Sequence, residues 1–135
     1  MSFIKYILAS SMIVLMATTP ENSNKWLINI DEAKKEAKNT ERPILLSFQG
    51  SDWCANCIRL ERSLFESESF KNYASENLIL LKADFPSRKK NKLSDEQTAH
   101  NEKLAEKFNK EGAFPTVIIL NAEGCLLYTS DAADD

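Results

Sequence analysis

Three segments of the chain are almost continuously apolar and have the length of a strand: residues 43–49 (PILLSFQ), 78–85 (LILLKADF) and 116–120 (TVIIL). Short apolar runs without polar alternation are typical of strands that are buried on both faces of a sheet. The turn-forming residues Gly50 and Ser51 end the first run. The pattern therefore predicts three buried strands.

Segments with helical spacing separate these runs. In residues 30–40, Ala33 and Ala37 lie one turn apart, and Asp31 is a candidate N-cap. A second helix is expected to begin near Cys54. It should bury the residues that recur at helical spacing: Cys57, Ile58, Leu60, Leu64 and Phe65.

Two more helices are expected further along the chain. Residues 67–77 read as a short helix, and another should start at Ser94 with Gln97 as its capping-box partner. The inward residues of the latter would be Leu104, Ala105 and Phe108. Strands that alternate with helices predict one α/β domain, with a mostly parallel sheet covered by helices on both faces.

The N-terminus resembles a secretory signal. Lys5 precedes an apolar run over residues 6–17, which is short for a membrane span, and polar residues follow at once. We therefore expect a signal peptide over residues 1–19 and a linker over 20–25, with an uncleaved membrane anchor at 6–17 as the alternative. Export would place the thiols in an oxidising compartment such as the periplasm.

Composition narrows the candidate functions. The 135-residue chain has a formal net charge of −3, which gives no sign of nucleic-acid binding. Its single histidine, His100, lies in a polar helical segment and is expected to be solvated. A structural zinc site needs four ligands, and one Cys-x-x-Cys pair supplies two, so no metal or other cofactor is expected.

Cys54 and Cys57 are the candidate reactive groups. Two thiols at this spacing can bind a metal, form a structural crosslink or exchange electrons. A crosslink that closes so short a loop stabilises a protein little. Cys54 lies where a loop becomes a helix, and the free N–H groups there stabilise a thiolate. Cys54 would attack an incoming disulfide, and Cys57 would resolve the mixed disulfide.

These residues resemble the thioredoxin family. The resemblance rests on SDWCANC after the strand PILLSF and on GAFPTVIIL downstream, and it covers roughly residues 26–124. The sequence is also similar to the C-terminal domain of the membrane thiol–disulfide interchange reductase. The resemblance implies a thioredoxin-like α/β fold with a central mixed sheet and helices on both faces.

The resemblance also implies roles for single residues. Cys54 would be the exposed nucleophile, Cys57 the buried resolving thiol, and Pro115 a cis-proline after Phe114. The supporting and substrate-binding residues would be Trp53, Ala55, Asn56, Phe114, Pro115 and Thr116. The implied partners are protein substrates, held through transient mixed disulfides, and a membrane thiol–disulfide reductase as electron donor. No nucleic-acid partner is expected, and the protein would be a monomer.

Two departures from thioredoxin bear on the chemistry. Ala55 and Asn56 replace Gly-Pro, and the strand before the motif has no buried acid. Proton transfer would then use water, Asp52 or Glu61, of which Asp52 is expected to be solvated. The absent acid and the polar Asn56 favour a reductant or a partner of the isomerase pathway.

Two rival functions stay open. One is a non-catalytic thioredoxin-like docking module, against which the intact pair of thiols argues. The other is a redox-dependent chaperone that uses the basic run at residues 88–92, although a solvated loop is the simpler interpretation.

The last residues of the chain have an unusual sequence. NAEG at 121–124 is a turn signal, and CLLYTSDAADD at 125–135 matches the translation of a transposase-type sequencing adapter. We therefore expect residues 125–135 to be non-native and the domain at 26–124 to be incomplete. Its last strand and last helix would be missing, apart from a few strand-like residues.

Overall fold

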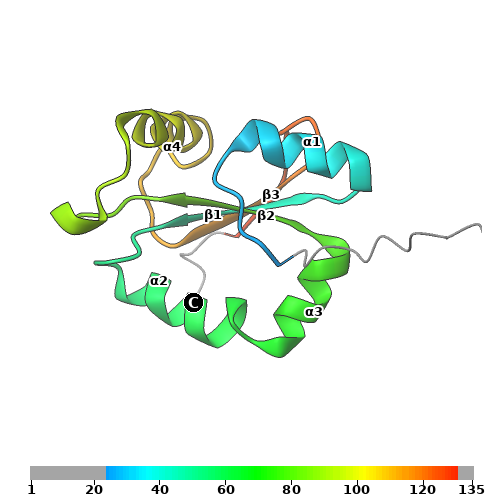
Figure 1. The fold of residues 1–135 in the computed structure, drawn as a ribbon, viewed down its shortest axis with the longest axis horizontal. Helices are drawn as coiled ribbons and strands as arrows, with labels where there is room; N and C mark the ends of the chain where they lie inside the picture. The colour runs from blue at the N-terminus through cyan, green and yellow to red at the C-terminus, as the bar shows by residue number, and fades with distance from the viewer. Residues whose placement is uncertain (1–23, 131–135) are drawn as a thin grey trace, which may run out of the picture.

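The computed structural model describes residues 24–130 and contains a four-stranded sheet between two layers of helices (Figure 1). Its elements in chain order are α1 (Ile30–Thr40), β1 (Ile44–Gln49), α2 (Ala55–Leu60), a π-helical turn η1 (Glu61–Phe65), α3 (Glu68–Asn77), β2 (Ile79–Asp84), a 3-10 turn η2 (Lys89–Asn91), α4 (Asp95–Phe108), β3 (Thr116–Leu120) and β4 (Leu126–Ser130). The expected signal peptide and most of the linker lie outside the described residues. No helix within residues 24–130 is long and apolar enough to cross a membrane.

The strand order is β2-β1-β3-β4. β1 is parallel to β2 and antiparallel to β3, and β4 is antiparallel to β3. The prediction of a mixed sheet is confirmed, whereas the prediction from apolar pattern alone, a mostly parallel sheet, is wrong. The segment between β2 and β3 leaves the sheet at Asp84, beside Gln49, and returns at Thr116, beside Phe48. A continuous apolar run reports burial on both faces but carries no information on strand direction.

The two faces of the sheet bury alternate residues of each strand. Leu46 of β1 packs with Ala33 of α1 and Leu104 of α4 on one face. Leu45 of β1 packs with Phe65 on the other face, which α2 and α3 cover (Figure 1). The three predicted strands and the expected helix layers on both faces are therefore confirmed.

The first residues of α1 and α4 differ from the prediction in two details. Asn29, and not Asp31, caps α1: its Oδ1 accepts from the backbone N–H groups of Asp31 and Glu32. Ser94 caps α4 as expected, with its hydroxyl accepting from the N–H of Gln97. The Gln97 side chain makes no reciprocal bond to Ser94, because its amide donates instead to the carbonyl of Ile28.

His100 is not the solvated residue that the sequence suggested. Its Nε2 accepts from the backbone N–H of Ile30 at 3.0 Å, so it binds the first residue of α1. Its Nδ1 lies 2.9 Å from Oδ1 of Asn101, and the amide of this buried asparagine donates to the carbonyl of Asp84. His100 and Asn101 thus connect α4 to both α1 and the end of β2.

The helix after Cys54 changes its hydrogen-bonding pattern at Glu61. The N–H of Glu66 donates to the carbonyl of Glu61, an i→i+5 bond that inserts one extra residue in the turn. Phe65 is buried, but Ile58 and Leu64 are exposed. Their predicted burial is therefore wrong. For Leu64, the inserted residue shifts the helical phase on which that prediction depended.

Residues 126–130 form β4, which falls on the few strand-like residues that the sequence indicated near the end of the chain. β4 pairs with β3 after a turn in which Oδ1 of Asn121 accepts from the N–H groups of Glu123 and Cys125. The side chains of Leu126, Leu127 and Tyr128 are exposed on this edge strand. Residues 131–135 lie outside the described part of the chain.

Candidate functional site: a disulfide at the start of a helix

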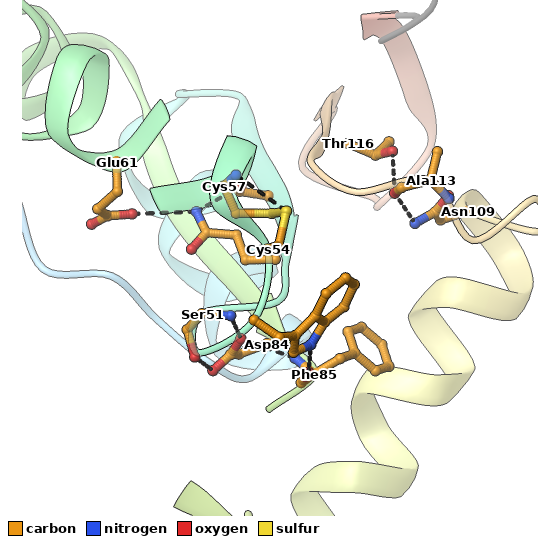
Figure 2. Close-up of a disulfide and its surroundings, with 12 residues drawn as sticks. Ser51, Cys54, Cys57, Glu61, Asp84, Phe85, Asn109, Ala113 and Thr116 are labelled. Carbon is orange, nitrogen blue, oxygen red and sulfur yellow. Dashed lines mark hydrogen bonds between the residues drawn. A yellow bond between two sulfur atoms is a disulfide. The ribbon is translucent and has the colours of Figure 1, made fainter. Parts of the chain in front are cut away.

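Cys54 and Cys57 form a disulfide at the N-terminus of α2 (Figure 2). The N–H of Cys54 donates to the carbonyl of Gly50 at 2.9 Å, which closes the turn after β1. Cys54 is then the N-cap of α2, and its Sγ accepts from the N–H of Cys57 at 3.2 Å. A sulfur at this position faces the unpaired N–H groups and the positive end of the helix dipole, both of which stabilise a thiolate.

Accessibility differs between the two sulfur-bearing residues. Cys54 is 7% exposed and Cys57 is 1% exposed. Cys54 is thus less exposed than the sequence suggested. Of the two cysteines it is still the more accessible to a partner. Ala55 and Asn56 between them are exposed at the first turn of the helix. Any partner that contacts Cys54 also contacts this turn.

Trp53 lies beside the disulfide and is 49% exposed. Its Nε1–H donates to the carbonyl of Phe85 at 2.7 Å, and its ring packs edge-on against Phe114, with centroids 5.4 Å apart. Gly50 lies directly beneath the indole, where a Cβ atom would overlap the ring. Gly50 thus both ends β1 and leaves room for the indole, because a side chain at this position would displace Trp53.

The segment before β3 forms the other side of the site. The Phe114–Pro115 peptide bond is cis. The hydroxyl of Thr116 donates to the carbonyl of Ala113 at 2.7 Å, and the amide of Asn109 donates to the same oxygen at 3.0 Å (Figure 2). Asn109 also accepts from the N–H of Ala113. Sequence analysis missed Asn109, which nothing in the local pattern distinguishes from a helix-ending residue.

A column of polar side chains lies behind Cys57 on the α2 face of the sheet. The buried Gln49 donates from its amide to the hydroxyl of Ser47 at 3.0 Å and to Oε2 of Glu61 at 3.3 Å. Nζ of Lys82 lies 3.2 Å from the same Glu61 oxygen and 4.7 Å from the centroid of the Trp26 ring. Burial of charged and amide groups among apolar residues is stable only when they are paired in this way.

Glu61 and Cys57 share a cavity. A pocket of about 210 Å³ is lined by both residues, together with Gln49 and Lys82. Of the groups considered for proton transfer, Glu61 is therefore the carboxylate that opens onto the space beside the inner cysteine. Gln49 and Lys82 were missed by sequence analysis, although a lysine within an apolar strand is itself a signal of a buried partner.

Asp52, unlike Glu61, binds the loop that follows β2. Its carboxylate accepts from the N–H groups of Ser87 and Arg88, each at 2.9 Å, and from the amide of Asn91 at 3.0 Å. The Ser87 bond, followed by the Asn91 bond, lowers the pKa of Asp52 to about 2. Asp52 is solvent-accessible, as the sequence suggested, and its bonds hold the loop after β2 against the active-site turn. So acidic a group is also a poor proton acceptor.

The described part of the chain contains no group of three or more histidine, cysteine, aspartate or glutamate side chains that could hold a metal ion. The two sulfur atoms are bonded to each other, and His100 is bonded to Ile30 and Asn101. The candidate reactive groups of the site are the disulfide and the carboxylate of Glu61, which lines the cavity beside Cys57.

The sequence model of a thioredoxin-like family matches residues 25–122. The chain belongs to this thioredoxin-like family. It is 37% identical over 93 residues to the disulfide bond reductase DsbH of Chlamydia pneumoniae, a match that covers 69% of this chain and 54% of that protein. It is 30% identical over 100 residues to the thiol:disulfide interchange protein DsbD of Ralstonia nicotianae, covering 74% of this chain and 14% of DsbD. The chain thus spans about half the length of DsbH and less of DsbD.

Two solved structures have a similar fold. The structure of a DsbH oxidoreductase superposes with a TM-score of 0.72 at 33% sequence identity, covering 78% of this chain and 71% of that one. A putative disulphide-isomerase from Bacteroides thetaiotaomicron superposes with a TM-score of 0.59 at 23% identity, covering 82% of this chain and 80% of that chain. The first supports membership of the family, and the second supports the fold.

Proposed function

We propose that the protein is a thiol–disulfide oxidoreductase that exchanges its Cys54–Cys57 pair with disulfides of other proteins. The observation that carries this proposal is the N–H of Cys57 directed at Sγ of Cys54 at the start of α2. This contact favours the thiolate of Cys54, which is the attacking species in disulfide exchange. The relatives that are named as a disulfide bond reductase and a thiol:disulfide interchange protein support the same chemistry.

The reaction begins from the reduced pair. The Cys54 thiolate attacks one sulfur of the substrate disulfide, and the other substrate sulfur leaves as a thiolate. Cys57 then loses its proton and attacks Cys54, which breaks the mixed disulfide and releases the second substrate thiolate. In total, two electrons pass from the protein to the substrate, the Cys57 proton is released to a base, and Cys54 and Cys57 end as the disulfide while the substrate ends as two thiolates.

Glu61 is proposed as the acceptor of the Cys57 proton. Its carboxylate shares a cavity with Cys57, and the hydrogen bond from Gln49 together with the ion pair with Lys82 keeps it oriented there. Asp52 is bound by three donors from another loop, and Asp84 accepts from Ser51 and Phe85. Glu61 is therefore the carboxylate best placed for the resolving step.

The substrate is proposed to lie across the exposed ring of Trp53 and the segment Phe114–Thr116. These two parts contact each other through the Trp53–Phe114 ring pair, so they form one continuous surface beside Cys54. Ala55 and Asn56, which are exposed at the first turn of α2, would border the same segment. An extended peptide chain fits such a surface.

The direction of electron flow is proposed to be reductive. The similarity to a disulfide bond reductase supports it, and a membrane thiol–disulfide reductase would regenerate the dithiol after each cycle. The reduction potential of the Cys54–Cys57 pair tests the direction. A value near thioredoxin's roughly −270 mV is expected, and one near −120 mV would mean an oxidant.

The protein is proposed to act as a monomer in an exported compartment. Residues 1–19 have the composition of a signal peptide, with Lys5 before an apolar run. Mass spectrometry of exported material should give a mature chain that begins between about Thr18 and Asn22. A chain that starts at Met1 in the membrane fraction would support an anchor instead.

Turnover of a protein disulfide tests the proposed activity. The purified protein should catalyse the reduction of insulin by dithiothreitol, and Cys54→Ser should abolish the catalysis. Cys125→Ser is the matched control, because Cys125 is a free, exposed thiol outside the site. If the parent protein gives no rate above dithiothreitol alone, the chain is a docking module and not an oxidoreductase.

A further inference from the structure

The loop between β2 and α4 carries a cluster of positive charges. Arg88, Lys89, Lys90 and Lys92 lie within five positions of each other, and all are exposed. Sequence analysis treated this run as a solvated loop. The structure assigns it a fixed place beside the disulfide.

Hydrogen bonds hold the loop to the two residues that precede Cys54. Asp52 accepts from the N–H groups of Ser87 and Arg88 and from the side chain of Asn91, and Trp53 donates to the carbonyl of Phe85. The basic residues are thus anchored at both ends of the cluster to the turn that carries the reactive sulfur. Their charges are held at the rim of the substrate surface.

Two of these four charges, those of Lys89 and Lys90, are in no ion pair of the described residues. Among residues 24–130, the ion pairs are Lys82 with Glu61 and Lys92 with Asp95, so Lys89 and Lys90 are in neither. The acids nearest the turn, Asp52 and Asp84, are already bound by backbone N–H groups. The rim therefore keeps a local positive charge.

Two further features belong to this surface. A cavity of about 390 Å³ between the loop and α4 is lined by the cations Arg88, Lys89 and Lys92 and also by the carboxylates of Asp84 and Glu102. The exposed Arg59 and Arg62 line a depression together with Ala55, the first residue of α2. Cations thus lie both on the loop that is bonded to Asp52 and along α2, whereas the whole chain has a net charge of −3.

We propose that this surface selects protein substrates in which acidic residues flank the reactive disulfide. The inference rests on the proposed oxidoreductase function and adds the class of substrate. Charges of one sign around a reactive centre raise the rate of encounter with partners of opposite sign, and salt screens the effect. A protein substrate fits better than a membrane or a nucleic acid, because the loop that carries the cations is bonded to the two residues before Cys54, while the net charge of the chain opposes binding to a polyanion.

Matched peptides test this proposal. Three peptides with one disulfide and identical residues next to the cysteines would carry glutamate, glutamine or lysine as their flanking residues. Their rates of reduction by the reduced protein would be measured at about 20 mM and about 500 mM salt, because the Debye length falls from about 20 Å to about 4 Å over that range. The acidic peptide should react roughly tenfold faster than the basic one at low salt, with the ratio approaching one at high salt.

Two double variants assign the preference to the loop. Lys89→Gln/Lys90→Gln should lower the ratio of acidic to basic rates about threefold, and Lys89→Glu/Lys90→Glu should invert it at low salt. Lys35→Gln/Lys38→Gln removes the same charge from the exposed side of α1 and should leave the ratio near that of the parent. All of these side chains are exposed, so each variant should keep the fold.

The outcomes separate this proposal from the general function. If the glutamine peptide is not reduced at all, the oxidoreductase function itself fails. If all three peptides are reduced at equal rates at low salt, or if the two lysine-to-glutamine variants behave alike, the activity stands and the acidic-substrate proposal is overturned. Loss of binding to anionic phospholipid vesicles in Lys89→Gln/Lys90→Gln, without any peptide preference in the parent, would overturn it in favour of a membrane surface.

Discussion

Glu61 and Lys82 form an ion pair, 3.2 Å between Oε2 and Nζ, that joins the helix of the disulfide to strand β2. The pair lies beside the cavity that Cys57 lines, and the buried amide of Gln49 donates to the same carboxylate oxygen. Strand β1 contains no acid, and Glu61 at the end of α2 provides a carboxylate that lines the cavity beside Cys57. Lys82 and Gln49 hold that carboxylate in place.

Glu61→Gln should slow the resolving step, because the amide cannot accept the proton of Cys57. A loss on the order of 10²-fold is expected for removal of a general base. Stopped-flow measurement of substrate release across pH 5 to pH 9 would record it, and the loss should shrink as the pH rises and hydroxide deprotonates Cys57. Glu76→Gln, at an exposed position on α3, is the control. A uniform loss at every pH would indicate a structural effect only.

Variants of the two cysteines should differ in the amount of mixed disulfide that they accumulate. Cys57→Ser keeps the accessible thiol and removes the resolving one, so it should accumulate mixed disulfides with substrate proteins. Cys54→Ser leaves only the 1% exposed Cys57 of the pair and should accumulate few, with both variants compared in the Cys125→Ser background. Non-reducing gels of lysates treated with an alkylating agent would compare the two. Equal trapping by both variants would contradict the assigned roles.

Asp52 should make the free energy of unfolding depend on pH in the acidic range. Its pKa is lowered from the usual 3.8 to about 2 in the folded protein, so the folded state binds fewer protons than the unfolded state between these values. The stabilisation is therefore present above about pH 4 and is lost as the pH falls towards 2. Urea unfolding of Asp52→Asn should show a deficit at pH 7 that narrows as the pH falls to about 2.

The control for this acid dependence is Glu106→Gln, which changes an exposed carboxylate on α4. It should follow the parent curve at every pH. A constant deficit of Asp52→Asn from pH 7 to pH 2 would mean that the Asp52 carboxylate does not titrate as the hydrogen bonds require.

Phe48→Ala should strongly destabilise the fold. Phe48 is fully buried in β1 among the residues that α1 and α4 cover, and the substitution would leave a cavity there. A loss of about 3–5 kcal/mol in the free energy of unfolding is typical for such a change. Tyr73→Ala, at a position 60% exposed on α3, should cost less than about 0.5 kcal/mol. Urea denaturation would measure both.

Local sequence determined the elements and the reactive pair. The runs that became β1, β2 and β3 were recognisable because every residue of a doubly buried strand tends to be apolar. Cys54 and Cys57 were recognisable because a strand break followed by helical spacing places them at a helix start, whatever the rest of the fold does. The position of Ser94 as a cap follows from its own hydroxyl and the next turn, both of which are local.

Tertiary structure decided the features that depend on contacts between residues distant in the chain. The direction of β3 depends on where the segment after β2 returns to the sheet, and no residue of the strand encodes it. The extra residue in the turn after Glu61 moved Leu64 to the surface and left Phe65 in the core.

The same holds for three polar residues, Asp52, Glu61 and His100. Nothing in the sequence distinguishes them from other polar residues. Their contacts in the fold are made with partners that lie 35, 21 and 70 positions away in the chain, respectively. A hydrogen bond or an ion pair needs its two atoms within about 3 Å. Only the packing of helices against the sheet brings them so close.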